Sequence, residues 1–232
     1  MELTDALRTT GAAREFTDEP VPDDVLERVL DNARFSPSGG NQQGWRVVVL
    51  RDPQLRTRLR DLYLPGWYDY LAMSAAGIRP WAPPNDREAE AEAMAGAPQV
   101  RAQAAAGPGG FAEHLDRAPV LLALVVDLRV LAAVDRDHDR YTFAGGASVY
   151  PFAWSVLLAA REEGLGGVMT TMAIREEPAV LELLHAPPGH ALAAVLALGH
   201  PVHQPSRLTR RPVGAFTTVD RLDGPPFGAG AG

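Results

Sequence analysis

A run of neutral hydrogen-bonding residues follows the first strongly amphipathic segment of this sequence. Residues 36–44 read Ser-Pro-Ser-Gly-Gly-Asn-Gln-Gln-Gly. Ser, Asn and Gln side chains both donate and accept hydrogen bonds, and glycines beside them let backbone N–H groups approach a ligand closely. Such a set suits a planar heterocycle with alternating donors and acceptors. The same residue types also form ordinary turns, so the local chemistry leaves a binding loop and a plain connector both open.

An arginine cluster near the C-terminus is the second candidate. Arg207, Arg210 and Arg211 lie within five residues of a chain whose formal net charge is −7. The planar guanidinium suits bidentate contact with a phosphate, whereas a solvated basic face is the plain alternative. The net negative charge argues against nucleic-acid binding, which needs a basic surface.

Two residue types on which many enzymes depend are absent. The 232 residues include no cysteine and no lysine, and all 22 basic residues are arginine. This composition excludes thiol nucleophiles, Cys-ligated clusters, disulfides, lysine Schiff bases and a Walker-A lysine. An enzyme with this sequence must therefore use a bound cofactor, histidine, carboxylates or hydroxyl groups.

The other motifs are weak. His200 and His203 have a spacing that occurs in zinc sites, but a proline between them spoils a helical arrangement. Residues 135–139 lack the glycine and the terminal glutamate of a calcium loop, and residues 164–167 do not form G-x-G-x-x-G. We expect no metal site and no Rossmann dinucleotide site. A cofactor-free hydrolase or lyase that uses His138 or His200 remains a rival hypothesis.

Hydrophobic patterning predicts the scaffold that positions these candidates. The predicted helices are a short first one capped by Thr4, and residues 23–35, 53–64, 148–163 and 178–185. The predicted strands are residues 45–51, 119–127, 166–171 and 191–198, with one more near 216–219. Four or five strands with helices between them indicate an α+β or α/β sandwich.

We expect one domain over residues 1–232, with two excursions from it. Residues 63–116 begin with aromatic residues and continue through a Pro-rich stretch into an Ala-rich helix. Long irregular segments in compact domains are usually functional or disordered, so we expect a lid over a site, against the alternative of an insertion without a role. Residues 201–232 are expected to form an extended C-terminal arm. No apolar run approaches the roughly 20 residues of a membrane span, and the N-terminus lacks a signal pattern, so we expect a cytoplasmic protein without a membrane partner.

Three blocks of the sequence resemble the FMN-dependent nitroreductase family. The first begins at Arg14-Glu-Phe16 and resembles R-x-F-x-x-x-x-V. The second is SPSGGNQQGW, residues 36–45, which is similar to A-P-S-x-x-N-x-Q-P-W. The third joins LLAAREEGLGG, residues 157–167, to ALGHP, residues 197–201. Together the resemblance covers residues 1–60 and about 118–222.

The resemblance implies an α+β three-layer sandwich, in which helices flank a central, mostly antiparallel sheet, and a homodimer with FMN at the subunit interface. It implies that Arg14 and the tail arginines Arg210 or Arg211 hold the FMN phosphate. The other implied cofactor-binding residues are Pro37, Ser38, Gly39, Asn41, Gln43, Gly166 and Gly167. FMN would carry hydride in ping-pong fashion from NAD(P)H to a small organic acceptor, a nitroaromatic compound or a quinone, without a catalytic side chain. A flavin-binding protein without turnover is the alternative.

The chain also departs from the family pattern. The run from Thr10 to Arg14 lacks an arginine and a serine that commonly contact the phosphate. Gly44 stands where a proline usually precedes Trp45, and we expect this to loosen the turn. Trp154 is a bulky residue that we expect to intrude on the flavin or dimer pocket.

Overall fold

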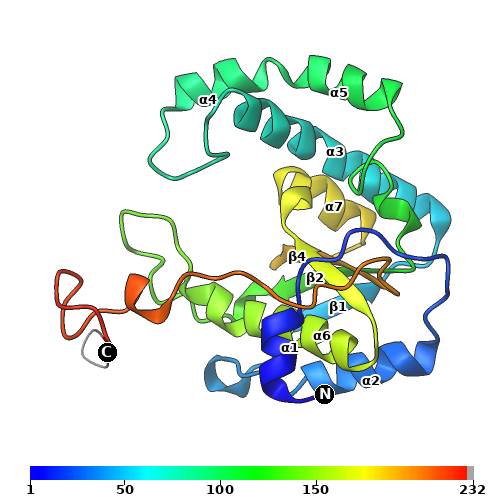
Figure 1. Ribbon diagram of the computed structural model, residues 1–232. Helices are drawn as coiled ribbons and strands as arrows, with labels where there is room; N and C mark the ends of the chain where they lie inside the picture. Colours follow the sequence, from blue (N-terminus) through cyan, green and yellow to red (C-terminus); the bar gives the residue numbers. More distant parts are fainter. Residues whose placement is uncertain (229–232) are drawn as a thin grey trace.

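The computed structural model describes residues 1–228, and a four-stranded antiparallel sheet lies at its centre (Figure 1). The strands are β1 (Trp45–Val49), β2 (Val120–Asp127), β3 (Gly166–Thr170) and β4 (His190–Gly199), in the order β1-β2-β4-β3. The register places Val47 opposite Leu124 and Gly167 opposite Leu198. All four strands predicted within the body are confirmed, although β1 ends two residues earlier than expected.

Helices cover both faces of the sheet. In the central strand β2, side chains alternate between the two faces: Leu122 and Leu124 join one apolar cluster, and Leu121 and Ala123 join the other. The first cluster packs under α2 (Asp23–Ala33) and α6 (Tyr150–Glu162), and the second under α3 (Pro53–Ala75) and α7 (Glu177–Leu183). Figure 1 shows these helices above and below the sheet. The predicted α+β three-layer sandwich is confirmed.

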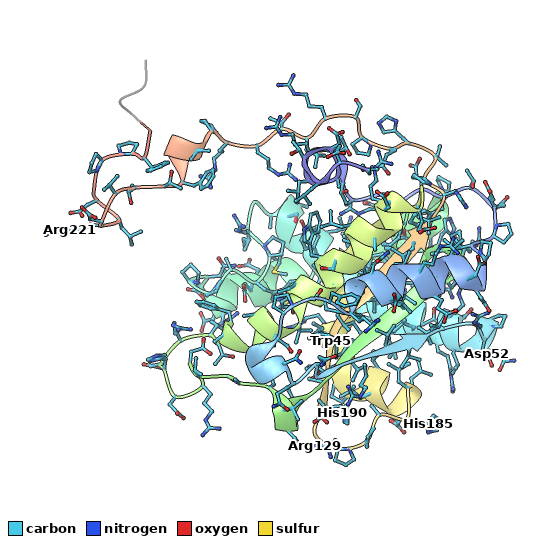
Figure 2. All side chains as sticks on the ribbon, turned by 90° about the horizontal axis from the view of Figure 1, so that it is seen from below. Trp45, Asp52, Arg129, His185, His190 and Arg221 are labelled. Carbon is cyan, nitrogen blue, oxygen red and sulfur yellow. The ribbon has the colours of Figure 1, made fainter. Side chains whose placement is uncertain are left out.

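The short first helix does not begin as predicted. Helix α1 (Leu3–Thr9) starts one residue before Thr4, and the N-cap position is Glu2, without a side-chain hydrogen bond to the helix. In α3, by contrast, Asp52 is a true cap: its Oδ1 accepts hydrogen bonds from the backbone N–H groups of Gln54 at 2.7 Å and Leu55 at 3.3 Å (Figure 2).

The segment predicted as an irregular excursion is largely helical. Helix α3 does not end at Leu64 but continues through Pro65 to Ala75, because its second half packs tightly: a Cβ at Gly66 would lie 2.9 Å from Arg175 Cγ. Helices α4 (Arg87–Met94) and α5 (Ala97–Ala106) then pack against α3 (Figure 1). The order of this segment is thus built from helix packing, while its role as a lid stays a prediction.

The C-terminal arm leaves the body of the molecule as an extended chain. After β4 it passes α1 and projects outward, and Arg221 near its far end lies well away from the sheet in both views (Figures 1 and 2). The strand predicted at residues 216–219 does not form: a 3-10 turn (Val213–Ala215) and one isolated bridge between Thr218 and Pro226 stand there. Residues 229–232 of the predicted arm lie outside the described residues.

Candidate functional site

The polar loop between α2 and β1 is anchored to α6 at both ends. Ser36 is buried, and its Oγ donates hydrogen bonds to the Ala33 carbonyl at 2.7 Å and to Ser155 Oγ at 2.8 Å. At the other end, the Trp45 ring stacks on Phe152 with centroids 4.8 Å apart. The residues between these anchors are mostly exposed, so the loop is a fixed rim with a free surface.

The rim has an unusual backbone. Gly40, Asn41 and Gln43 all have positive φ angles, of 59°, 54° and 49°. Non-glycine residues avoid this region because Cβ approaches the backbone. Hydrogen bonds hold the conformation: Ser38 Oγ accepts from the Gln43 N–H at 2.9 Å, and the Gly39 N–H donates to Ser148 Oγ at 2.9 Å. Such conformations concentrate at functional sites.

Four of the predicted flavin-binding residues therefore present their polar groups from one rigid rim. Pro37, Gly39, Asn41 and Gln43 are exposed, and Ser38 is half-buried. The Gln43 amide nitrogen lies 3.3 Å from Asn41 Oδ1, so the two amides form a continuous hydrogen-bonding edge. The structure thus brings the predicted loop residues together.

Gly44 does not loosen this loop. A Cβ at this position would lie 2.9 Å from Val130 Cγ2 and 3.4 Å from the Asp127 carbonyl oxygen. The Gly44 carbonyl also accepts a hydrogen bond from the Asp127 N–H at 2.9 Å. The expectation of a loosened turn was wrong, since close packing against the end of β2 fixes the glycine in place.

Gly166 and Gly167 lie within strand β3, although we predicted a turn there. The turn is made by Gly164, whose φ is 77°. A Cβ at Gly167 would lie 2.4 Å from Leu198 Cδ2, and one at Gly166 would lie 2.9 Å from Ala13 Cβ. The Gly167 carbonyl accepts a hydrogen bond from the Ala13 N–H at 2.9 Å. The two glycines therefore let the N-terminal segment lie directly against the sheet edge.

A buried tyrosine continues the site beyond the end of β3. Tyr63 is 3% exposed, and Thr170 Oγ1 donates a hydrogen bond to its hydroxyl at 3.2 Å. Burial raises the pKa of Tyr63, and the positive charge of nearby Arg14 acts in the opposite direction. Arg14 itself lines a cavity of about 340 Å³ together with Phe111 and His114. The sequence argument missed Thr170 because a lone threonine carries no motif.

An aromatic row runs outward from this tyrosine along α3. Trp67 and Tyr70 stack with centroids 5.4 Å apart, and Tyr70 lies 6.4 Å from Trp81. The Arg175 guanidinium lies over the Trp81 ring at 5.0 Å. The i, i+4 and i+7 spacing of residues 63, 67 and 70 places them on one helix face. Their aromatic character was visible in the sequence, but the continuous face needed the full length of α3.

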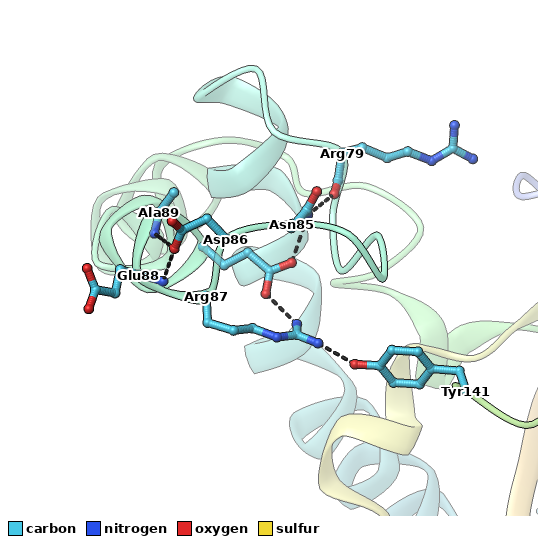
Figure 3. A network of polar contacts seen from close by, with 8 residues as sticks. Arg79, Asn85, Asp86, Arg87, Glu88, Ala89 and Tyr141 are labelled. Atoms are coloured by element: carbon cyan, nitrogen blue, oxygen red, sulfur yellow. Dashed lines mark hydrogen bonds and ion pairs between the residues drawn. The ribbon is translucent and has the colours of Figure 1, made fainter. Parts of the chain in front are cut away.

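A polar network fixes the loop that carries Trp81 to the rest of the molecule (Figure 3). Glu90 is 3% exposed, and its carboxylate accepts hydrogen bonds from Asn85 Nδ2 at 2.8 Å and from Arg87 Nη1 at 2.7 Å. Arg87 also donates to the hydroxyl of Tyr141. Hydrogen bonds from Asn85, followed by those from Arg87, lower the pKa of Glu90. The network joins the segment before α4 to the loop that follows β2.

That second loop is organised from within. We predicted a solvated charged loop at residues 135–140, but Asp135 is buried and accepts hydrogen bonds from the Phe143 N–H at 2.9 Å and from Arg140 Nη1 at 2.8 Å. These contacts lower the pKa of Asp135 to about 2. The acid is a structural centre that a sequence pattern of charges does not reveal.

The predicted phosphate-binding arginines do not meet within one chain. Arg210 lines a cavity of about 810 Å³ with Arg8 and Arg207, whereas Arg14 lines the cavity described above. Arg211 is exposed on the arm. The sequence argument missed Arg8, whose place in the fold depends on the arm passing over α1.

Neither histidine of the rival hydrolase hypothesis has a catalytic setting. His138 lies on an exposed loop, and His200 Nε2 lies 3.6 Å from Glu19 Oε1. Within residues 1–228, no group of three His, Asp or Glu side chains is placed to hold a metal ion. Over the same residues, no helix is both long and apolar enough to cross a membrane. Trp154 is 38% exposed on α6, so its ring does not fill the interior of its own chain.

Comparison with known proteins fits this architecture. The profile of the nitroreductase family matches residues 7–200. The chain is 27% identical over 199 residues to 5,6-dimethylbenzimidazole synthase of Rhodobacter capsulatus, covering 86% of this chain and 83% of the synthase. It is 24% identical over 200 residues to iodotyrosine deiodinase 1 of Rattus norvegicus, covering 86% of this chain but only 62% of the deiodinase.

A solved structure shares the fold. An iodotyrosine deiodinase bound to FMN and 3-iodo-L-tyrosine superposes with a TM-score of 0.62 at 23% identity, covering 91% of this chain and 96% of that one. The sheet order, the polar loop before β1 and the glycines of β3 occupy the region over which the family profile matches. The chain belongs to the nitroreductase family.

Proposed function

We propose that this chain is a cytoplasmic, homodimeric FMN-dependent oxidoreductase that accepts hydride from NAD(P)H and passes it to a planar aromatic acceptor, a nitroaromatic compound or a quinone. The observation that carries the proposal is the strained rim at Ser38, Asn41 and Gln43. Two non-glycine residues with positive φ are held there by hydrogen bonds, on an exposed loop that packing alone does not require. Strain of this kind is retained where a ligand needs it.

The groups on this rim fit the flavin ring. The pyrimidine edge of FMN alternates hydrogen-bond donors and acceptors, and a hydroxyl and two amides match such an edge better than charged side chains would. When bound, FMN supplies the hydride chemistry, which suits a chain without cysteine or lysine. The work left to the protein is to orient the ring, stabilise charge at its polar edge and bind its phosphate.

The aromatic row on α3 supports a planar acceptor. It starts at Tyr63, which is bonded to Thr170 at the end of β3, and reaches Trp81 on the segment before α4. Gly166 and Gly167 lie on the same strand as Thr170. A ring bound beside β3 would therefore have aromatic faces next to it, under a segment fixed by the Arg87 network. We propose that residues 63–116 act as the lid.

Exposed apolar side chains support the homodimer. On the arm, Phe216 is 61% exposed and Leu222 is 99% exposed. On the body, Phe143 and Trp154 are also exposed. Large exposed apolar surfaces mark interaction sites. Because the rim and the arm arginines line separate parts of one chain, we propose that a second copy completes the flavin site and that the arm lies on the partner.

The test is to purify the protein, record its visible spectrum, add FMN where needed, and then add NADPH anaerobically. We expect a bound-flavin spectrum that bleaches with NADPH and recovers when menadione or nitrofurazone is added. A tightly bound flavin that NADPH does not bleach, or that reoxidises with neither acceptor, would support the flavin-storage alternative instead. A protein that gains no flavin spectrum at all would contradict the proposal.

A further inference from the structure

A cavity of about 810 Å³ lies between the last turn of α1 and residues 206–210 of the arm. The arm is held there by defined contacts: the Leu208 N–H donates to the Arg8 carbonyl at 3.1 Å, and Gln204 Nε2 donates to the Thr9 carbonyl at 2.9 Å. Figure 1 shows the arm crossing this end of the helix. Two carbonyls at the negative end of α1 are thus already partnered and do not need a cation.

The polar lining of this cavity is mainly cationic and hydroxylic. It comprises the arginines Arg8, Arg207 and Arg210, the hydroxyl residues Thr9, Ser206 and Thr209, and a single acid, Asp5. Three guanidiniums and one carboxylate leave a positive surplus at this place on a chain of net charge −7.

These three guanidiniums lack carboxylate partners. Within residues 1–228, none of them has an Asp or Glu oxygen within the 4 Å of an ion pair, whereas Arg28 and Arg129 each pair with an acid at 2.7–2.8 Å. Arg210 Nη1 donates only to the neighbouring Thr209 carbonyl, at 2.8 Å. Arginines gathered without acids are a ready binding site for a doubly charged anion, because each planar fork can make two charge-assisted hydrogen bonds.

Two buried polar atoms on the same segments also lack partners. Thr10 is 8% exposed, and its Oγ1 makes no hydrogen bond; neither does Oε1 of Gln204. Buried polar atoms without partners are uncommon and call for an explanation. Thr10 follows the cavity-lining Thr9, and Gln204 ties the arm to that residue. A bound ligand with its water shell would supply the missing partners.

Arg14 belongs to a different place. It acts electrostatically on Tyr63, which is bonded to Thr170 of β3, and it lines the cavity that contains Phe111 and His114. Arg14 therefore lies by the aromatic row, where a ring would bind, and not by the arm.

We propose that Arg8, Arg207 and Arg210 bind the phosphate monoester of FMN, with Arg8 supplying the contact from α1, and that Arg14 contacts the ring part of the cofactor. This inference rests on the proposed function and assigns the phosphate to residues that the family pattern does not single out. The chemistry recognised is a phosphate monoester dianion, which the 2′-phosphate of NADPH also carries, so the test must separate the two sources.

The test compares the affinities of full-length protein for FMN and riboflavin, which differ only in the phosphate. We expect Arg8→Ala and Arg210→Ala each to weaken FMN binding by about 10- to 100-fold, the effect of losing a hydrogen bond to a charged group, and to leave riboflavin binding unchanged. Asp5→Asn should strengthen FMN binding, because it removes the one acid of the cavity. Arg14→Ala should weaken both flavins alike, and Arg58→Ala, on the opposite face of the sheet, should change neither.

Each other outcome decides against the inference. Unchanged FMN affinity in both Arg8→Ala and Arg210→Ala would overturn it, as would equal losses for FMN and riboflavin. Unchanged FMN affinity together with a lost preference for NADPH over NADH binding would assign the cavity to the nucleotide phosphate. Wild-type protein that binds neither flavin would instead overturn the proposed function itself. Because all three guanidiniums are exposed, thermal unfolding should confirm that the variants are folded.

Discussion

The Gly167→Ala variant separates two explanations for the glycines of β3. One is that the glycine lets a flavin ring approach the backbone, and the other is that it lets the sheet and its neighbours pack. The structure favours packing: the added Cβ would lie 2.4 Å from Leu198 Cδ2, 3.0 Å from Leu157 Cδ2 and 2.9 Å from the Ala197 carbonyl oxygen. Leucine side chains can rotate, but that carbonyl belongs to β4 and cannot move without distorting the sheet.

The expected loss follows from these contacts. Overpacking a well-filled interior destabilises by about 1–3 kcal/mol, and three simultaneous contacts, one of them with backbone, place Gly167→Ala near the upper end. The alanine also restricts the unfolded chain, which offsets about 0.4–1 kcal/mol. We expect a net loss of about 2 kcal/mol in the free energy of unfolding, or a fall in Tm of roughly 4–8 °C for a protein of this size.

The assay is thermal and urea unfolding of the flavin-free protein, followed by flavin titration of the folded variant. Gly107→Ala is the matched control, since its backbone is extended at φ −108° and the nearest atoms to an added Cβ are 3.8 Å away. The control should change stability by less than about 0.5 kcal/mol. A Gly167→Ala variant that keeps wild-type stability but loses flavin would refute the packing account and restore the glycine as a flavin contact.

Three further predictions concern the rim, the lid and the loop after β2. Asn41→Gly should relieve the positive-φ strain and raise the free energy of unfolding by about 0.5 kcal/mol while weakening flavin binding; equal or lower stability in urea would contradict the strain. Arg87→Ala leaves the buried carboxylate of Glu90 without its cation, so limited proteolysis near residues 79–90 should accelerate, and adding Glu90→Gln should slow it again; an unchanged digestion rate would remove the network as a latch. Because the pKa of Asp135 is lowered to about 2 in the folded protein, its stabilisation is present above the ordinary value of 3.8 and is lost as the pH falls towards 2. Asp135→Asn should flatten the acid dependence of Tm in that window, and an identical pH profile would show that the carboxylate does not hold the loop.

The sheet and its covering helices could be predicted because their signals are local. A buried strand such as Val120–Asp127 is a continuous apolar run between turn residues, and the helix at Asp23–Ala33 has acids in its first turn and an apolar face. The polar loop was found for the same reason, since its residue types are adjacent in the chain. Its positive φ angles were not, because Asn and Gln adopt many conformations and only their hydrogen bonds to Ser38 and Ser148 select this one.

The remaining features depend on contacts between distant segments. Pro65 predicts the end of a helix, but packing of Gly66 against Arg175 keeps α3 continuous. Asp135 reads as a solvated charge, and it is buried only because the chain folds back to bring the Phe143 N–H to it. Arg8 reads as a surface residue of α1 until the arm, some 200 residues later in the sequence, passes over it. No local pattern encodes such meetings.

The most direct test of the account is the visible spectrum of the purified protein, recorded before and after anaerobic addition of NADPH. If the rim at Ser38, Asn41 and Gln43 holds a flavin for hydride transfer, the protein should show bound FMN, and the flavin absorbance should bleach on NADPH addition and return with a quinone or nitroaromatic acceptor. A protein that remains colourless after incubation with FMN, although folded and dimeric, would contradict the central claim.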